Sequence, residues 1–360
     1  MTAHKTKLEY VHHQILKKIS EENMEPGDKL PSELEFQKMY DVSRHTVRSA
    51  LNRLENAGII VKEQGAGSFV AKLKPKRDYK EIGVITTYVS DYIFPLTIRG
   101  IEQELTKNGY SMILSSTNND RDIEEAAIQM MIDRNVDGVI VEPTQSSYYN
   151  SNLGLYLKLK NMGIPIIMIN ARYEGLDFPL IALDDLNAGY EATKNLIENN
   201  HTNIGGIFKA DDLQGQERHK GFIKACFEYG INYNKENIFF YETDNFNEVI
   251  STKVSEMVKS KRVTGVVCYN DTVAIEILKL IWTFGYNVPE DLSIVSHDNS
   301  TLSSITEVKI NSINHPKTIL GRDAAINIIK MVEDPNYEMD SIFYPAKMIE
   351  KQSVKKLDIE

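Results

Sequence analysis

The fold of the N-terminal part is decided by the stretch DVSRHTVRSALNRLENAG, residues 41–58. If a helix begins after Ser43, its apolar residues recur with the helical period and form one stripe that faces a core. Ser43 can cap the first turn, and Gly58 can adopt the left-handed conformation that ends a helix. The spacing therefore predicts an amphipathic helix between these two residues. Its apolar stripe consists of Val47, Ala50, Leu51 and Leu54.

The opposite face of this predicted helix is polar and cationic. A helix that enters the major groove of DNA end-on makes most of its base contacts from its first turn. Taken alone, the pattern also fits an ordinary solvent-exposed helix. The polar residues on this face are His45, Arg48, Ser49 and Asn52, flanked by Arg44 and Thr46.

Charge is divided unevenly along the 360 residues, which have a formal net charge of −10. Residues 1–80 contain 15 Lys and Arg against 11 Asp and Glu, whereas the rest contains 26 against 40. A basic segment attached to an acidic body indicates a nucleic-acid-binding module joined to a domain with another task. The two cysteines, Cys226 and Cys268, lie in apolar runs and predict neither a disulfide framework nor a thiolate metal site.

Two further helices are predicted before the helix that lies between Ser43 and Gly58. Residues 5–23 carry apolar side chains at the helical period, and Ser32 with Glu35 forms a capping box that opens a helix through about Tyr40. Since only Asp41 and Val42 separate that helix from Ser43, the pattern is typical of a helix-turn-helix.

A β-hairpin is predicted directly after Gly58. Residues 59–62 and 68–70 are mostly β-branched or aromatic, and the glycine-containing segment 64–67 between them suits a tight tip. Such a hairpin could simply close a small core. Beside a recognition helix it reads as a wing, whose glycine tip lets the backbone approach the minor groove or a phosphate.

Three motifs in this order carry a family resemblance: LPSE at 30–33, VSRHTVRSAL at 42–51 and QGAGSFV at 64–70. Together they resemble the winged helix-turn-helix head of the GntR family of bacterial transcription regulators. The resemblance implies a DNA-binding domain over residues 1–70, and the basic, proline-containing residues 71–80 read as a linker. The DNA-contacting residues implied are Ser43, Arg44, His45, Thr46 and Arg48 from the helix and Gln64 and Gly65 from the wing.

The body, residues 81–360, alternates short β-branched runs with helical stretches. This alternation predicts an α/β fold with parallel sheets covered by helices, and its length predicts two lobes with a cleft at the carboxyl ends of the strands. No phosphate-binding glycine loop follows a predicted strand, so we expect no nucleotide cofactor. The predicted strands are residues 82–85, 112–114, 138–141, 164–169, 180–183, 204–207, 238–240, 265–268 and 292–295.

Polar side chains gather directly after these strands. Glu142, Asn170, Asp185 and Asn270 are examples, and carboxylates, amides and an arginine beside aromatic rings suit the hydroxyls of a small sugar. Any single one is more often a helix cap than a ligand contact, because Asp and Asn are ordinary caps. The prediction therefore rests on the cluster as a whole and not on any single residue in it.

The phrases QERHKGF at 216–222, CYNDTVA at 268–274 and VPEDLSIVSHD at 288–298 resemble the effector domain of the LacI/GalR family. That resemblance implies a fold similar to periplasmic sugar-binding proteins. It also implies that Arg218, Asp271 and Asp298 hold sugar hydroxyls while Phe94 or Phe246 stacks on the ring. His297 departs from the family, which usually has an aromatic residue there. The candidate ligand-binding residues are Tyr92, Phe94, Glu142, Arg218, Phe246, Asp271 and Asp298.

A GntR-type head on a LacI-type body resembles the arabinose-responsive repressors, which implies L-arabinose as the effector. We therefore expect a cytoplasmic homodimer that binds double-stranded operator DNA and is released by this sugar, without a cofactor, enzymatic activity or membrane association. One alternative is a different sugar or a sugar phosphate, and another is a body with enzymatic activity. His219, His297 and His315 could serve a metal or acid–base site, although their wide spacing favours isolated structural roles.

Replacement of Arg48 by alanine should weaken operator binding by about 1–3 kcal/mol, because a bidentate contact to a base would be lost. Gel shifts with an operator fragment measure this change. An unchanged shift would remove Arg48 from base readout.

Overall fold

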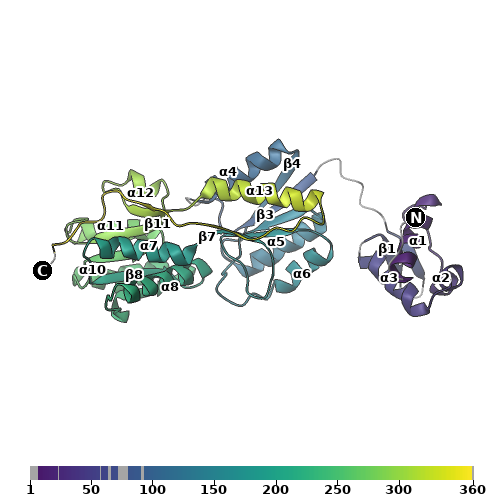
Figure 1. Ribbon diagram of the computed structural model, residues 1–360, viewed down its shortest axis with the longest axis horizontal. Helices are drawn as coiled ribbons and strands as arrows, with labels where there is room; N and C mark the ends of the chain where they lie inside the picture. Colours follow the sequence, from purple (N-terminus) through teal and green to yellow (C-terminus); the bar gives the residue numbers. More distant parts are fainter. Residues whose placement is uncertain are drawn as a thin grey trace. The chain divides into compact units, whose positions relative to one another are not determined.

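The computed structural model describes residues 7–22, 24–56, 58–63, 66–71, 80–90 and 93–358. The chain divides into a head that ends before Lys80 and a body that begins there (Figure 1). Each is described by itself. Among the helices in these ranges, none is both long and apolar enough to cross a membrane.

The head is a three-helix domain with a small hairpin, as predicted. The predicted apolar stripe of the third helix is buried against Val11, Ile15 and Phe36 from the other two helices. Ile60 and Val70 of the hairpin complete this core. The elements are α1 (Lys7–Glu21), α2 (Glu33–Tyr40), α3 (Arg44–Asn56), β1 (Ile60–Glu63) and β2 (Gly67–Val70).

Local hydrogen bonds fix the turn between α2 and α3. The predicted capping box is present, since Ser32 Oγ accepts from the Glu35 amide and Glu35 Oε2 accepts from the Ser32 amide at 2.7 Å. Asp41 has a left-handed backbone with φ of 49°, which ends α2. Ser43 Oγ then accepts from the Thr46 amide at 3.2 Å and caps α3.

The segment before α2 forms backbone hydrogen bonds with β2 of the hairpin. The Leu30 amide donates to Ser68 O at 2.8 Å, and the Val70 amide donates to Asp28 O at 2.9 Å. Of the linker expected over residues 71–80, residues 72–79 lie outside the described residues. At its two ends, the Ala71 amide donates to Ile59 O at 2.9 Å, and Lys80 is the first residue of a strand.

The first lobe of the body is a parallel sheet with strand order β13-β7-β6-β5-β3-β4. Helices α4 and α13 pack on one another, and Ile101 and Ile328 belong to the core that they share with the sheet. The strands are β3 (Lys80–Thr86), β4 (Tyr110–Ser116), β5 (Gly138–Val141), β6 (Ile166–Ile169), β7 (Leu180–Leu183) and β13 (Ile342–Tyr344). The helices are α4 (Phe94–Lys107), α5 (Arg121–Arg134), α6 (Leu153–Asn161) and α13 (Lys317–Glu333).

The second lobe repeats this plan with strand order β14-β12-β11-β10-β8-β9, in which β14 runs antiparallel to β12. The strands are β8 (Ile204–Lys209), β9 (Ile238–Tyr241), β10 (Gly265–Cys268), β11 (Ser293–Asp298), β12 (Asn311–Asn314) and β14 (Met348–Ile349). The α-helices are α7 (Asp185–Glu198), α8 (Leu213–Glu228), α9 (Phe246–Val249), α10 (Ser255–Lys259), α11 (Asp271–Thr283) and α12 (Leu302–Ile305). Shorter turns are η1 (Lys235–Asn237), η2 (Thr243–Asn245) and the π-turn η3 (Ile250–Val254).

The chain passes between the lobes at three places. It leaves the first lobe after β7, returns after β12 through His315 and Pro316, and crosses again between β13 and β14. Figure 1 shows the consequence: α13 lies with α4 and β3, far along the chain from them. The sequence did not predict β12, β13 and β14. The first is partly polar, with the sequence NSIN at 311–314, and the other two are only three and two residues long.

Two pairs of glycines let helices cross so closely that their backbones are in contact. A Cβ on Gly189 of α7 would collide with Arg218 O of α8, and one on Gly221 of α8 would collide with Leu186 O of α7. The first lobe uses the same device, with Gly100 of α4 and Gly321 of α13. The α7–α8 crossing holds α8 against the second sheet, which sets the position of Arg218.

Gly221→Ala should therefore destabilise the second lobe by about 1–3 kcal/mol, the usual cost of overpacking. Denaturant titration of the full chain measures the loss. Gly154→Ala is the matched control, because an added Cβ there meets nothing within 4 Å and alanine favours a helix. Equal stability of the two variants would contradict this account of the crossing.

Candidate functional site

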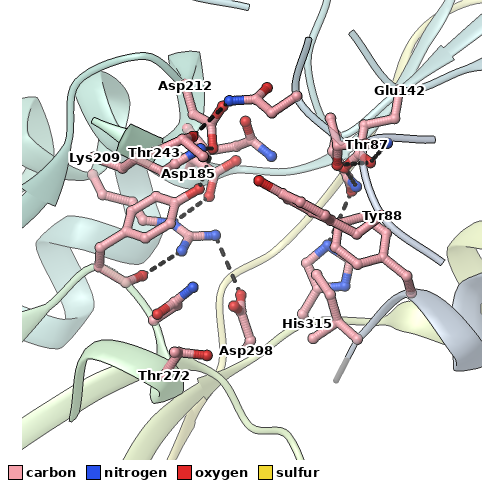
Figure 2. Close-up of a pocket in the computed structure, with 18 of the residues that line it drawn as sticks. Thr87, Tyr88, Glu142, Asp185, Lys209, Asp212, Thr243, Thr272, Asp298 and His315 are labelled. Atoms are coloured by element: carbon pink, nitrogen blue, oxygen red, sulfur yellow. Dashed lines mark hydrogen bonds and ion pairs between the residues drawn. The ribbon is translucent and has the colours of Figure 1, made fainter. Parts of the chain in front are cut away.

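A pocket of about 610 Å³ lies between the two lobes, at the carboxyl ends of the central strands (Figure 2). Its size suits a small organic ligand. The first lobe supplies Thr87, Tyr88, Phe94, Glu142 and Asn170, and the segment that returns to it supplies His315. The second lobe supplies Asp185, Lys209, Asp212, Arg218, Tyr241, Phe246, Tyr269, Asn270 and Asp298, among others.

The Arg218 guanidinium is the most constrained group in the pocket and is 3% exposed. Its Nε lies 2.7 Å from Asp185 Oδ1, its Nη1 donates to Tyr269 O at 2.5 Å, and its Nη2 lies 3.4 Å from Asp298 Oδ1. Burial opposes the charge, but Asp185 and Asp298 raise the Arg218 pKa overall. Burial also raises the pKa of Asp185 to about 6. The pocket thus contains a fixed cation between two carboxylates.

Lys209 forms a second charged group at the end of β8. Its Nζ lies 2.8 Å from Asp212 Oδ2 and 3.2 Å from Asp211 Oδ1. Burial disfavours the ammonium, yet the two carboxylates raise its pKa overall. Tyr269 OH also donates to Asp212 Oδ2 at 2.9 Å, so that this carboxylate is shared.

The first lobe contributes one wall of the pocket, which is built around the carboxyl group of Glu142. Its Oε2 accepts from the Thr87 amide at 3.0 Å and from Thr87 Oγ1 at 2.6 Å, while Oε1 accepts from Asn170 Nδ2 at 2.7 Å. Burial raises the Glu142 pKa. Asn170 Oδ1 lies 3.1 Å from His315 Nε2, which links the wall to the segment that joins the lobes.

Aromatic rings lie on both sides of the pocket. Phe94 packs edge-on against Tyr88 at 5.8 Å between ring centroids, and Phe246 packs against Tyr241 at 4.9 Å. In Figure 2, the Tyr88 side chain extends from the Thr87 side toward the Asp185 side of the pocket. Such faces can cover the apolar side of a sugar ring.

The structure places five of the seven candidate ligand-binding residues in the lining: Phe94, Glu142, Arg218, Phe246 and Asp298. Tyr92 lies outside the described residues. Asp271 is placed differently from our expectation, because it is 0% exposed and does not line the pocket. Its carboxylate instead accepts from the Ser300 amide and Ser300 Oγ, both at 2.7 Å, and from Ser312 Oγ at 2.8 Å.

Asp271 therefore supports the turn after β11, and its neighbours Asn270 and Thr272 line the pocket in its place. Sequence reasoning also missed Tyr88, Lys209 and His315. Position after a strand could have identified Tyr88 and Lys209, which stand at the ends of β3 and β8. The sequence suggested His315 only for a metal or acid–base site and not for the pocket wall, because β12 itself was not recognised.

The lobes also contact each other directly beside the pocket. Ser147 Oγ donates to Ala210 O at 2.6 Å, the Leu213 amide donates to Ser146 Oγ at 2.9 Å, and Asn119 Nδ2 donates to Asp211 Oδ2 at 3.0 Å. Tyr148 OH donates to Glu242 at 2.7 Å. These bonds bring the lobes together at one rim of the pocket.

In the head, the polar face of α3 is open to solvent. His45 and Arg48 are exposed, and Thr46 Oγ1 lies 2.8 Å from Ser43 Oγ. Arg44 is exposed as well, and its Nε lies 2.9 Å from Glu33 Oε2 of α2. Gln64 and Gly65 lie outside the described residues.

The three histidines considered for a metal or acid–base site are separated. His297 Nδ1 lies 2.8 Å from Cys268 O, His219 Nε2 lies 3.3 Å from Tyr233 OH, and His315 lies in the pocket wall. Within the described ranges, no group of three or more His, Cys, Asp and Glu side chains is arranged to hold a metal ion.

Comparison with known proteins defines the class. Residues 7–70 match the model of the bacterial regulatory proteins of the gntR family, and residues 193–354 match a periplasmic binding protein-like domain. A LacI family transcriptional regulator from Enterococcus faecium, solved with bound ribose, superposes with a TM-score of 0.66 at 25% identity, over 78% of this chain and all of that one. The transcription regulator CcpA of Lactococcus lactis has the same fold, with a TM-score of 0.69 at 24% identity over 77% of this chain and 100% of that one. The molecule is a bacterial transcription regulator with a GntR-type head and a LacI-type body.

More specific relatives are similar over nearly the whole chain. The arabinose metabolism transcriptional repressor of Halalkalibacterium halodurans is 43% identical over 97% of this chain and 96% of its own length. That of Geobacillus stearothermophilus is 41% identical over 96% of both. The chain belongs to the family of arabinose metabolism transcriptional repressors.

The geometry predicts different effects for substitutions of Asp271 and Asp298. Asp271→Ala should lower stability by about 1–3 kcal/mol, because it leaves buried donors without an acceptor, and sugar affinity should fall with it. Asp298→Asn should weaken sugar binding with a smaller loss of stability. Calorimetry and thermal melts measure both. An Asp271→Ala protein that melts normally yet binds no sugar would restore Asp271 as a direct contact.

Proposed function

We propose that this repressor binds operator DNA as a homodimer and is released when L-arabinose occupies the pocket between the lobes. The observation that carries the proposal is the Arg218 cluster, which presents charged donors and acceptors in a buried cleft of suitable size. The names of the two similar repressors support arabinose as the effector.

The hydrogen-bonding groups of the pocket match a polyol. A sugar hydroxyl both donates and accepts, and the pocket offers carboxylates as acceptors and the Arg218 and Lys209 cations as donors. A guanidinium has five N–H groups, of which three are directed at Asp185, Tyr269 and Asp298. We infer that sugar oxygens accept from the remaining N–H groups.

The charge of the pocket favours a neutral sugar over a sugar phosphate. Among the described lining residues there are two cations, Lys209 and Arg218, and both are already paired with carboxylates. The lining carboxylates are Glu142, Asp185, Asp212 and Asp298. A phosphate would meet this negative excess in a buried site, where like charges repel strongly.

Ligand binding and the arrangement of the lobes are coupled through the connecting segments. Asp185 opens α7 directly after the first crossing, and His315 lies in the second. A ligand that contacts both lobes stabilises whichever arrangement it fits better. In a dimer that arrangement sets the spacing of two recognition helices, which must reach successive major grooves of one operator.

Thermal melts of the full-length protein with sugars test the proposed effector. L-arabinose at about one hundred times its Kd should stabilise the protein by about 2.7 kcal/mol, whereas arabinose 5-phosphate should have little effect. The same sugar should release the protein from its operator in a gel shift. A protein that binds operator DNA equally with and without L-arabinose would refute the proposal, and stabilisation by the phosphate would refute the charge argument.

A further inference from the structure

Lys317 is the first residue of α13, a position where two physical factors disfavour a cation. The residue is only 6% exposed, and burial lowers the pKa of its ammonium, although Asp298 and Asp271 oppose the shift. The N-terminus of a helix also carries a partial positive charge, which repels a cation. Residues that break such local rules are expected at functional positions, so a lysine here indicates a role for its ammonium.

The Lys317 ammonium donates to three backbone carbonyls. Its Nζ contacts Asp298 O and lies 3.2 Å from both Asn299 O and His315 O. An ammonium has three N–H groups, so these acceptors use all of them. Because the group is buried, the loss of any of these bonds would leave a polar group without a partner, which destabilises a protein.

The ammonium and two of its acceptors belong to different lobes. Helix α13 is part of the first lobe, since Leu320 lies in the core that α13 shares with α4 and the first sheet. Asp298 ends β11 of the second lobe, and the amide of the next residue, Asn299, donates to Ser312 Oγ of β12 at 2.9 Å. Lys317 therefore holds a turn of the second lobe to a helix of the first.

Asp298 connects this interaction to the pocket. Its carboxylate lines the pocket and lies 3.4 Å from Arg218 Nη2 (Figure 2), whereas its carbonyl accepts from Lys317. The backbones of Asp298 and Asn299 are left-handed, with φ of 90° and 42°. Two consecutive non-glycine residues in this region are strained, and they keep this conformation only where surrounding contacts hold them. A ligand that displaces the Asp298 carboxylate therefore also displaces the carbonyl that Lys317 binds.

We propose that Lys317 is a positioning residue that couples occupation of the pocket to the arrangement of the lobes, by holding the turn of Asp298 and Asn299 to α13. The inference rests on the proposed function, because it requires that a sugar in the pocket changes operator binding. Lys317 is not part of the pocket lining. Its loss should therefore uncouple the two binding events without abolishing either of them.

Lys317→Met tests this role, because methionine fills a similar volume and has no N–H donor. In the wild type, L-arabinose should weaken operator binding by a factor in the usual allosteric range of about 5–150. In the variant, sugar and operator should each still bind when offered alone, but the factor should fall below about two.

Anisotropy of a labelled operator and calorimetry of L-arabinose, each with and without the other ligand, measure this factor in two ways. The two values must agree, because the coupling of two binding events is reciprocal. A residue with a merely structural role would weaken one affinity or both and would leave the factor unchanged.

Lys351→Met is the matched control. Lys351 Nζ also has three oxygen neighbours, Ser303 Oγ at 2.8 Å, Ser304 Oγ at 3.3 Å and Ser303 O at 3.4 Å, and burial lowers its pKa as well. These groups follow β14 or lie in α12, so all of them belong to the second lobe. This variant should keep the wild-type factor, and an equal loss of the factor in both variants would overturn the proposal.

Lys317→Gln serves if Lys317→Met does not fold, since its amide keeps one donor group and the factor should still be lower than in the wild type. If operator binding by the wild type ignores L-arabinose, the proposed function fails and this inference fails with it. If the wild type responds and the folded Lys317 variant responds by the same factor, only the role of Lys317 is refuted.

Discussion

The buried guanidinium of Arg218 is the constraint on which the rest of the body depends. A charge removed from water must be matched by charges and hydrogen bonds, or it destabilises the fold. Its partners come from the start of α7, the end of β10 and the end of β11, since they are Asp185, Tyr269 O and Asp298. The cluster forms only where these elements converge. The close crossing of α7 and α8 through Gly189 and Gly221 brings Arg218 to that point.

The Arg218 cluster also connects ligand binding to the arrangement of the lobes. Asp185 follows the first crossing between the lobes, and the wall of Glu142, Asn170 and His315 extends to the second. The groups suited to a sugar are thus attached to the segments about which the lobes are joined. The contacts of Ser146 and Ser147 at the rim add bonds between the lobes that need no ligand. The lobe arrangement is therefore set jointly by these contacts and by what occupies the pocket.

Much of the head could be predicted from the sequence, because the signals that define its helices are local. The apolar stripe of α3, the capping box at Ser32 and the cap at Ser43 could all be predicted, since each depends on residues three or four positions apart. The pairing of Arg44 with Glu33 was not predicted, because it depends on how α2 and α3 cross. That pair holds an exposed cation at the first turn of the helix expected to read DNA.

By itself, the sequence determined the winged head, the alternating strands of the two lobes and most of the polar residues at the strand ends, because local periodicity and capping chemistry specify these. The tertiary structure decided the rest. It showed that α13 and β13 return to the first lobe, a choice made by packing against segments more than a hundred residues earlier. It also decided that Asn270 lines the pocket while the adjacent Asp271 is buried beneath it, because neighbouring side chains at a helix start point in different directions. His315 entered the site for the same reason: only the fold brings the end of β12 beside Asn170.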